Sequence, residues 1–199
     1  MTSVPIIGGK DLLNGKRFDK GGYILTYDYD KWSFIDPKEA QKKLNLPRNP
    51  RDYTSIAVTT DDSNDEIVYA SSMGDGVIQY KNGTPVQSYN EKNAFKETAG
   101  GYGSGYCYID GLAFDKNGNL WMTSSEVNHA VLVLDKAGAW HRLDIEQLRG
   151  VYTINDILIT STNDKWIYVP RNTPKLVMIP NSESLDEVSS YEFTTLIDT

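Results

Sequence analysis

The residues whose types could support binding or catalysis are few, and several of them lie together in the middle of the chain. The segment Gly100–Tyr108, GGYGSGYCY, contains Tyr102, Tyr106 and Tyr108 beside the single cysteine, Cys107. Tyrosine combines a flat apolar ring with a polar tip, which suits recognition of a glycan or a peptide. The alternative is that the glycines only let the chain cross the end of a sheet while the tyrosines pack locally.

Catalytic chemistry has little support in the sequence. His129, next to Asn128, has the surroundings of a general base or metal ligand, but a solvated loop histidine has them as well. The only other histidine is His141, so a zinc site would need carboxylates to complete its ligands. No base can be paired with Cys107 from the sequence, and a small buried residue explains it equally well. We expect no catalytic residue.

Two acidic turns have part of the pattern of a calcium loop. Asp115, Asn117 and Asn119 place oxygen-bearing side chains at alternate positions, but the distal glutamate of such a loop is missing. A tight Asn-Gly turn between two apolar runs explains the same residues. The run Asp61–Glu66 is a longer acidic turn, better explained by solvation. We therefore expect neither a metal nor another cofactor.

Composition excludes several classes of protein. The 199 residues include 20 Lys and Arg and 27 Asp and Glu, which gives a net charge of −7. An acidic chain does not suit general binding of nucleic acid, because phosphate neutralisation needs an excess of cations. No apolar run is long enough to insert into a membrane, and the first residues do not resemble a signal peptide. One cysteine cannot form an internal disulfide.

The chain contains an internal repeat. Around the Asn117–Gly118 turn, two apolar runs predict a β-hairpin. Adding 45 to the positions of this segment carries Leu112 onto Ile157 and Trp121 onto Trp166. One shift without gaps matches apolar residues through three predicted strands. Four short strands in about 45 residues are typical of a β-propeller blade, which must stack on neighbours to bury its faces.

The sequence therefore predicts an all-β fold built from four-stranded antiparallel propeller blades. We expect a single propeller region over residues 1–199, with a helix over 36–44 and one helical turn over 144–150 between blades. About 3.75 blades favour part of a larger propeller over a closed four-bladed ring. The predicted copies are a partial blade, 1–36, and three blades, 51–90, 107–145 and 152–197.

One stretch resembles a known family. The segment 110–124, DGLAFDKNGNLWMTS, followed by VLVLD and a turn into Trp140, resembles the two-component regulator propeller repeat. That family occurs in extracellular sensor regions of hybrid histidine kinases. It also occurs in the propeller of a surface component of the type IX (Por) secretion system of Bacteroidetes. The resemblance implies a blade fold and a periplasmic or cell-surface location, and it implies function only weakly.

Propeller geometry suggests where a ligand would bind. Connections from a fourth strand to the next first strand lie on the same face as those between second and third strands. The predicted ligand-binding residues on this face are Tyr102, Tyr106, Tyr108, Asp110, Asn128, His129 and Arg171.

We expect a non-enzymatic extracytoplasmic recognition or sensor module that binds a glycan, a peptide or a partner protein. Open blade edges could also allow self-association. The alternative is a metal-dependent enzyme of the propeller lyase or lactonase kind. Its ligands would come from the starts of inner strands, at Asp52, Asp110 and Asn155–Asp156.

Overall fold

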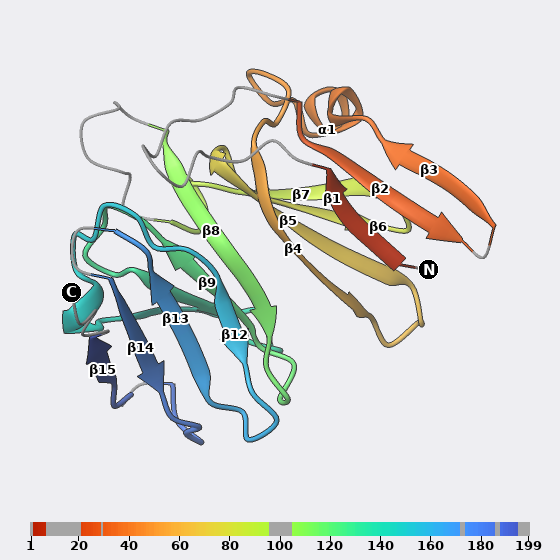
Figure 1. Ribbon diagram of the computed structural model, residues 1–199. Coiled ribbons are helices and arrows are strands. Elements are labelled where there is room, and N and C mark those ends of the chain that lie inside the picture. The colour runs from red at the N-terminus through yellow and green to blue at the C-terminus, as the bar shows by residue number, and fades with distance from the viewer. Residues whose placement is uncertain are drawn as a thin grey trace. The chain divides into compact units, whose positions relative to one another are not determined.

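Antiparallel β-strands are the main secondary structure in the computed structural model (Figure 1), which describes residues 2–6, 21–28, 30–95, 105–171, 174–185 and 188–194. The chain divides into two compact units, Met1–Ile109 and Asp110–Thr199. Among the described residues, no helix is both long and apolar enough to cross a membrane.

Unit 1 contains two sheets and one helix. In the first sheet, β2 lies between β1 and β3. In the second sheet, each strand pairs with the next along the chain. The elements are β1 (Thr2–Ile6), β2 (Tyr23–Asp28), β3 (Lys31–Ile35), α1 (Pro37–Leu44), β4 (Tyr53–Thr60), β5 (Glu66–Gly74), β6 (Gly76–Lys81) and β7 (Thr84–Tyr89).

The helix α1 forms where the sequence predicts it. Asp36 is the N-cap, and its Oδ1 accepts a hydrogen bond from the Lys38 backbone N–H at 2.9 Å. Pro37 occupies the first turn, where its missing N–H costs nothing. Asn45 ends the helix in the left-handed conformation. The helix lies against the edge strand β7 (Figure 1).

The two sheets of unit 1 enclose a common core. Ile24 of β2 is fully buried, and it packs with Val68 and Ile78 of the second sheet. Tyr53 and Tyr80 join their hydroxyl groups by a 2.7 Å hydrogen bond inside this core. Burial raises the pKa of Tyr80 to about 12, so both hydroxyls stay protonated at neutral pH.

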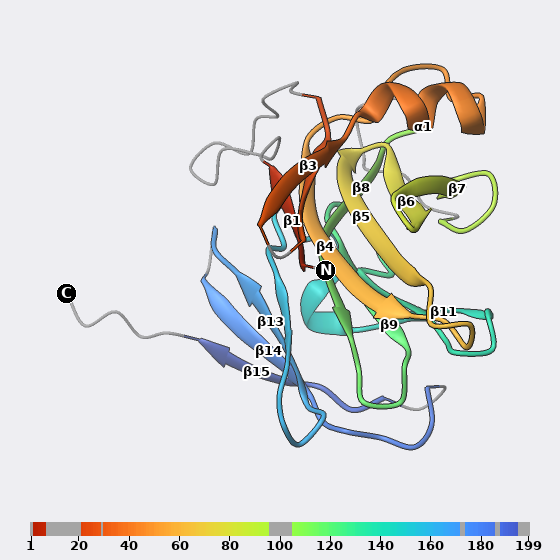
Figure 2. The same ribbon diagram turned by 90° about the vertical axis from the view of Figure 1, so that its right-hand side faces the viewer.

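The strand β8 (Cys107–Phe114) begins in unit 1, where Cys107 and Tyr108 pair with Gly74 and Met73 at the end of β5. Through this pairing, β4–β11 belong to one eight-stranded sheet, in the order β11-β10-β9-β8-β5-β6-β7 with β4 beside β5. We call its unit 1 strands, β4–β7, the second sheet and its unit 2 portion, β8-β9-β10-β11, the third sheet. The fourth sheet has the order β12-β13-β14-β15. Figure 2 shows β13, β14 and β15 side by side. The remaining elements are β9 (Leu120–Ser124), β10 (Val131–Leu134), β11 (Trp140–Leu143), the 3₁₀ turn η1 (Glu146–Leu148), β12 (Ile157–Ile159), β13 (Lys165–Val169), β14 (Lys175–Ile179) and β15 (Tyr191–Thr194).

The repeat found in the sequence is also present in the strand pairing of unit 2. Trp121 of β9 pairs with Val133 of β10, and Trp166 of β13 pairs with Met178 of β14. Both pairs keep the 45-residue shift. The predicted fold class, an all-β fold of antiparallel propeller-like sheets, is confirmed. The single region over 1–199 and the blade boundaries stay predictions.

Sheet-on-sheet packing forms the core of unit 2. One face of the third sheet and one face of the fourth contribute buried apolar side chains to a single cluster. The third sheet supplies Trp121, Val131, Val133 and Leu143. The fourth supplies Ile157, Ile167, Val169, Val177 and Ile179. Burial of such faces is the main stabilising term for stacked blades.

Candidate functional site

A pocket of about 340 Å³ lies in unit 1 where several inter-strand connections meet; we call it the loop-face pocket. Its walls come from the segment that precedes β4, the turn between β5 and β6, the chain after β7, and the start of β8. In an antiparallel sheet these four places lie at the same end of the strands. The lining residues are Leu46, Pro47, Arg48, Pro50, Asp75, Asn90, Glu91, Lys92, Gly105 and Tyr106.

An ion pair holds one side of this pocket in place. Arg48 Nε donates to Asp75 Oδ1 at 2.7 Å, and Nη2 lies 2.5 Å from the same oxygen. The other carboxylate oxygen accepts the backbone N–H of Arg51 at 3.1 Å and lies 3.4 Å from the Ser72 hydroxyl. Ser72 also donates to the Arg51 carbonyl at 2.6 Å. Asp75 is thereby fixed from several directions and orients the Arg48 guanidinium.

Tyr106 supplies the aromatic part of the pocket. The Arg48 guanidinium carbon lies 5.5 Å from the centroid of the Tyr106 ring, within the range of a cation–π contact. Tyr108 contacts Tyr106 edge to face, with ring centroids 6.1 Å apart. Tyr108 itself is only 4 % exposed and packs with Met73. The structure thus brings two predicted residues together, with Tyr106 on the pocket and Tyr108 behind it.

The turn that carries Asp75 needs glycine on its far side. Gly76 has a φ of +78°, and a Cβ there would lie 2.1 Å from the Tyr89 carbonyl oxygen. A side chain at this position would collide with the backbone at the end of β7. Glycine therefore permits the close approach of two connections that shape the pocket.

Cys107, next to Tyr106, is not arranged as a nucleophile. It is 1 % exposed, and burial raises the pKa of its thiol to about 12. At neutral pH almost none of it is the thiolate that attacks or binds metal.

In unit 2, the predicted residue Asp110 serves to connect two repeats. Its Oδ2 accepts a 2.5 Å hydrogen bond from the Ser125 hydroxyl. Ser125 Oγ in turn accepts the backbone N–H of Ile154 at 2.9 Å. All three residues are buried, so this chain of hydrogen bonds fixes the connection that enters the fourth sheet.

The other predicted residues lie on connections. Asn128 is exposed and His129 is half-buried, both between β9 and β10, and Arg171 is half-buried after β13. Tyr102 lies outside the described residues. A ligand-binding role for the seven residues stays a prediction.

The two acidic turns use their oxygens within the protein. Asp115 accepts the backbone N–H groups of Asn117 and Asn119 at 2.9 and 2.8 Å, and the Trp121 indole N–H at 2.9 Å. Asp61 accepts from Lys81 Nζ at 2.7 Å, and this ion pair lowers the pKa of Asp61. Across the described ranges, no three His, Cys, Asp or Glu side chains gather as metal ligands would.

The residues proposed as metal ligands under the enzyme alternative, Asp52, Asn155 and Asp156, each accept a hydrogen bond within the protein. The Asp52 carbonyl accepts the Met73 N–H at 3.0 Å. The Asn155 carbonyl accepts the Thr123 hydroxyl at 2.9 Å, and Asp156 Oδ1 accepts the Ile157 N–H at 2.9 Å.

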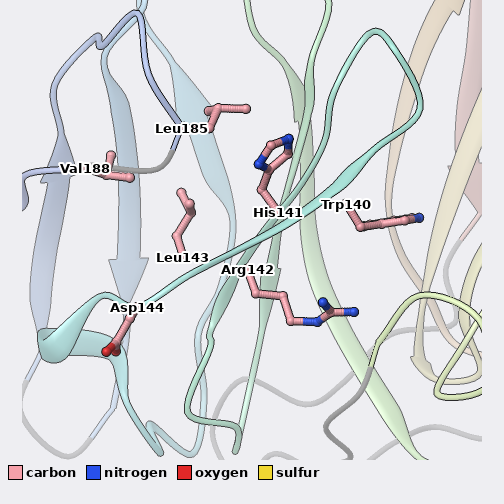
Figure 3. Close-up of a pocket in the computed structure, with 7 residues that line it drawn as sticks. All are labelled: Trp140, His141, Arg142, Leu143, Asp144, Leu185 and Val188. Carbon is pink, nitrogen blue, oxygen red and sulfur yellow. The ribbon is translucent and has the colours of Figure 1, made fainter.

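A second hollow of about 640 Å³ lies along β11 in unit 2 (Figure 3). Leu143 lies on the side of Leu185 and Val188, which belong to the connection between β14 and β15. Both of these side chains pack against the unit 2 core. Two of its polar side chains have local partners: His141 Nε2 lies 2.9 Å from Asp135 Oδ2, a hydrogen bond that lowers the pKa of Asp135, and Asp144 Oδ2 lies 2.5 Å from Arg149 Nη2. This hollow therefore lies at the edge of the hydrophobic core of unit 2. We place the candidate site at the loop-face pocket instead.

Several solved structures resemble this chain, among them the following two. One is PorZ, an essential bacterial surface component of the type IX secretion system of Porphyromonas gingivalis, with a TM-score of 0.76 and 19 % identity over 86 % of this chain. The other is the extracellular domain of BT3049 from B. thetaiotaomicron, described as a hybrid two-component system, with a TM-score of 0.53 and 17 % identity over 95 % of this chain. This chain spans about a quarter of their length, 24 % and 22 % respectively.

No protein-family model matches the sequence, and comparison with curated proteins gives no match. The two structures represent the two kinds of protein in which the resembled repeat occurs, so the resemblance is confirmed at the level of the fold.

Sequence reasoning missed Arg48, Asp75 and Glu91, which line the pocket beside Tyr106. A signal for Asp75 existed, because Gly74-Asp75-Gly76 is the connection between a second and a third strand and lies on the expected face. No local pattern marked Arg48, because its role depends on contact with Asp75, which is 27 residues away in the sequence and is brought close only by the fold.

Proposed function

We propose that this chain is part of a non-enzymatic recognition propeller, located in the periplasm or at the cell surface, and that its loop-face pocket binds a glycan or a peptide. The pocket lies at the end of the strands where connections gather, and it combines charge with an aromatic ring. Its volume of about 340 Å³ falls within the range of small-ligand sites and suits a sugar ring or one peptide side chain.

The observation that carries the proposal is the oriented pair of Arg48 and Tyr106. The Arg48 side chain is 37 % exposed, whereas that of its partner Asp75 is 15 % exposed, so the guanidinium remains accessible while its anchor is covered. An arginine held in position loses less conformational freedom on binding than a free one. Its N–H groups suit hydroxyl or carboxylate oxygens of a ligand, while the tyrosine ring suits an apolar sugar or side-chain face.

The similar structures support the proposed location. PorZ is a surface component and the BT3049 domain is extracellular. The same two structures support a role beside a secretion system or as the sensor part of a two-component system.

The test is binding of the fluorescently labelled protein to arrays of bacterial and host glycans and of short peptides. Arg48→Ala and Tyr106→Ala are each expected to weaken every signal about tenfold or more, the effect of about 1.4 kcal/mol. Arg149→Ala is the matched control, because Arg149 also pairs with an aspartate, Asp144, but does not line the pocket.

Binding that survives both pocket variants would refute the assignment of the site. Tight stoichiometric calcium or zinc together with hydrolytic activity would instead favour the metal-dependent lyase or lactonase alternative, which has no specific observation in its support.

A further inference from the structure

Both faces of the fourth sheet carry large apolar side chains, and the charged residues of its strands, Lys165, Lys175 and Glu192, lie on the inner face. Its inner face belongs to the unit 2 core. The strand pairing places the following residues on its outer face, and none of them is charged: Leu158, Trp166, Tyr168, Leu176, Met178 and Tyr191. Leu158 is 65 % exposed and Tyr191 is 54 % exposed. A sheet with one face in water normally alternates apolar and polar residues, so this outer face has the composition of a buried one.

The repeat shows what kind of surface covers these positions. In the third sheet, the residues 45 positions earlier are Trp121, Val131 and Val133, which correspond to Trp166, Leu176 and Met178. The third-sheet residues are at most 1 % exposed.

What buries them is the inner face of the next sheet along the chain, with Ile157, Ile167, Val177 and Ile179 in the same cluster. The outer face of the fourth sheet is therefore built to meet the apolar inner face of a further sheet.

The first sheet presents a face of the complementary kind. Its inner side, with Ile24, packs on the second sheet. Its other side carries only aromatic and aliphatic residues in β2 and β3, namely Tyr23, Leu25, Tyr27, Trp32 and Phe34. Trp32 is 58 % exposed and Phe34 is 65 % exposed. In the order of stacking, this is the face that a preceding sheet would cover.

We propose that the outer face of the fourth sheet binds the outer face of the first sheet of a second copy of this chain. In a stacked repeat, the face that a sheet turns toward the next sheet along the chain packs on the face which that next sheet turns back toward it. One copy offers both halves of such a contact, on separate sheets. The resulting association is head-to-tail, because two different faces of the chain meet. It is also distinct from pairing of strand edges, because side chains and not backbone groups form it.

The first experiment measures the mass of the chain by analytical ultracentrifugation from about 1 to 100 μM. The wild-type mass is expected to rise above 22.3 kDa with concentration. Phe34→Asp and Leu158→Asp are each expected to stay monomeric, because each places a charge in one of the faces. Val86→Asp and Tyr152→Asp are the controls, since these side chains are 42 % and 44 % exposed but lie on neither face.

A mixture of the two face variants tests the direction of the contact. Phe34→Asp keeps an intact fourth sheet and Leu158→Asp keeps an intact first sheet. Equal amounts are therefore expected to form a dimer of twice the chain mass, although each variant alone is a monomer. Circular dichroism of each variant confirms that it remains folded.

A wild-type chain that stays monomeric at 100 μM overturns the proposal. So does Leu158→Asp forming a dimer by itself, because this would show like faces meeting. Equal weakening by Val86→Asp would show that any added charge acts, and would overturn it as well.

Discussion

Replacing Asp115 by alanine tests how the repeat is stabilised. Asp115 is 7 % exposed, and its carboxylate accepts four hydrogen bonds within one hairpin. Three of them hold the turn through Asn117 and Asn119. The fourth reaches the indole N–H of Trp121, which is 1 % exposed and packs between two sheets.

The expected loss follows from what each donor can do without its partner. The buried Trp121 N–H would remain unpaired, which costs about 2 kcal/mol, whereas the turn N–H groups can bond to water and cost about 1 kcal/mol together. The variant should therefore lose about 3 kcal/mol of unfolding free energy. Loss of the Asp115 charge would also destabilise the protonated Lys165 side chain, which lowers the free energy of unfolding further. Its Nζ lies 4.5 Å from the Trp121 ring centroid, and the Asp115 charge supports its protonated form against the desolvation that lowers its pKa.

Urea unfolding followed by far-UV circular dichroism measures this value. In a Trp121→Phe background, which has no indole N–H to leave unpaired, Asp115→Ala should cost about 2 kcal/mol less than in the wild type. Asp135→Ala is the matched control, because Asp135 accepts the same kind of turn hydrogen bond from Ala139 N–H without a buried indole donor. We expect a smaller loss there. An equal loss for Asp115→Ala and Asp135→Ala, or no change in the Trp121→Phe background, would refute the reasoning.

Two further predictions concern unit 1 and its pocket. Gly76→Ala should lower the free energy of unfolding by about 2 kcal/mol or more, because a Cβ would lie 2.1 Å from the Tyr89 carbonyl oxygen. Gly138→Ala should cost only about 1 kcal/mol of backbone strain, because no atom beyond the adjacent residues lies within 4 Å of the added Cβ. Thermal unfolding compares the two variants, and equal losses would contradict the argument from close approach. The Cys107 thiol, whose pKa burial raises to about 12, should react with a disulfide reagent at pH 8 at least about 100-fold more slowly in the folded than in the urea-unfolded chain. Because the unfolded thiol loses its proton near pH 8.5 and the folded one near 12, its contribution to stability falls as pH rises through this window, and Cys107→Ala should reduce that fall; similar thiol reaction rates in both states would contradict the predicted burial.

Much of the fold was predictable because it depends on local pattern. The alternation of apolar and polar residues and the Asn117–Gly118 turn are properties of short segments that favour strands and hairpins. The 45-residue shift shows that the same local pattern recurs along the chain. The Asp36 cap placed the helix for the same reason. The candidate site was predictable only in part. An unusual glycine- and tyrosine-rich segment drew attention to Tyr106, and the rule for propeller connections pointed to the end of the strands where the loop-face pocket lies; a binding role there stays a prediction.

The sequence by itself determined the repeating unit, the apolar faces and the acidic charge, because these depend only on residue order and composition. The tertiary structure decided which side chains meet across long separations. Arg48 and Asp75 form an ion pair only because the segment between α1 and β4 and the β5–β6 turn reach the same end of the second sheet. Tyr108 is buried while its neighbour Tyr106 lines the pocket, since β8 pairs with β5 at that point. Such contacts depend on how sheets stack, and stacking is set by packing between segments that no local pattern contains.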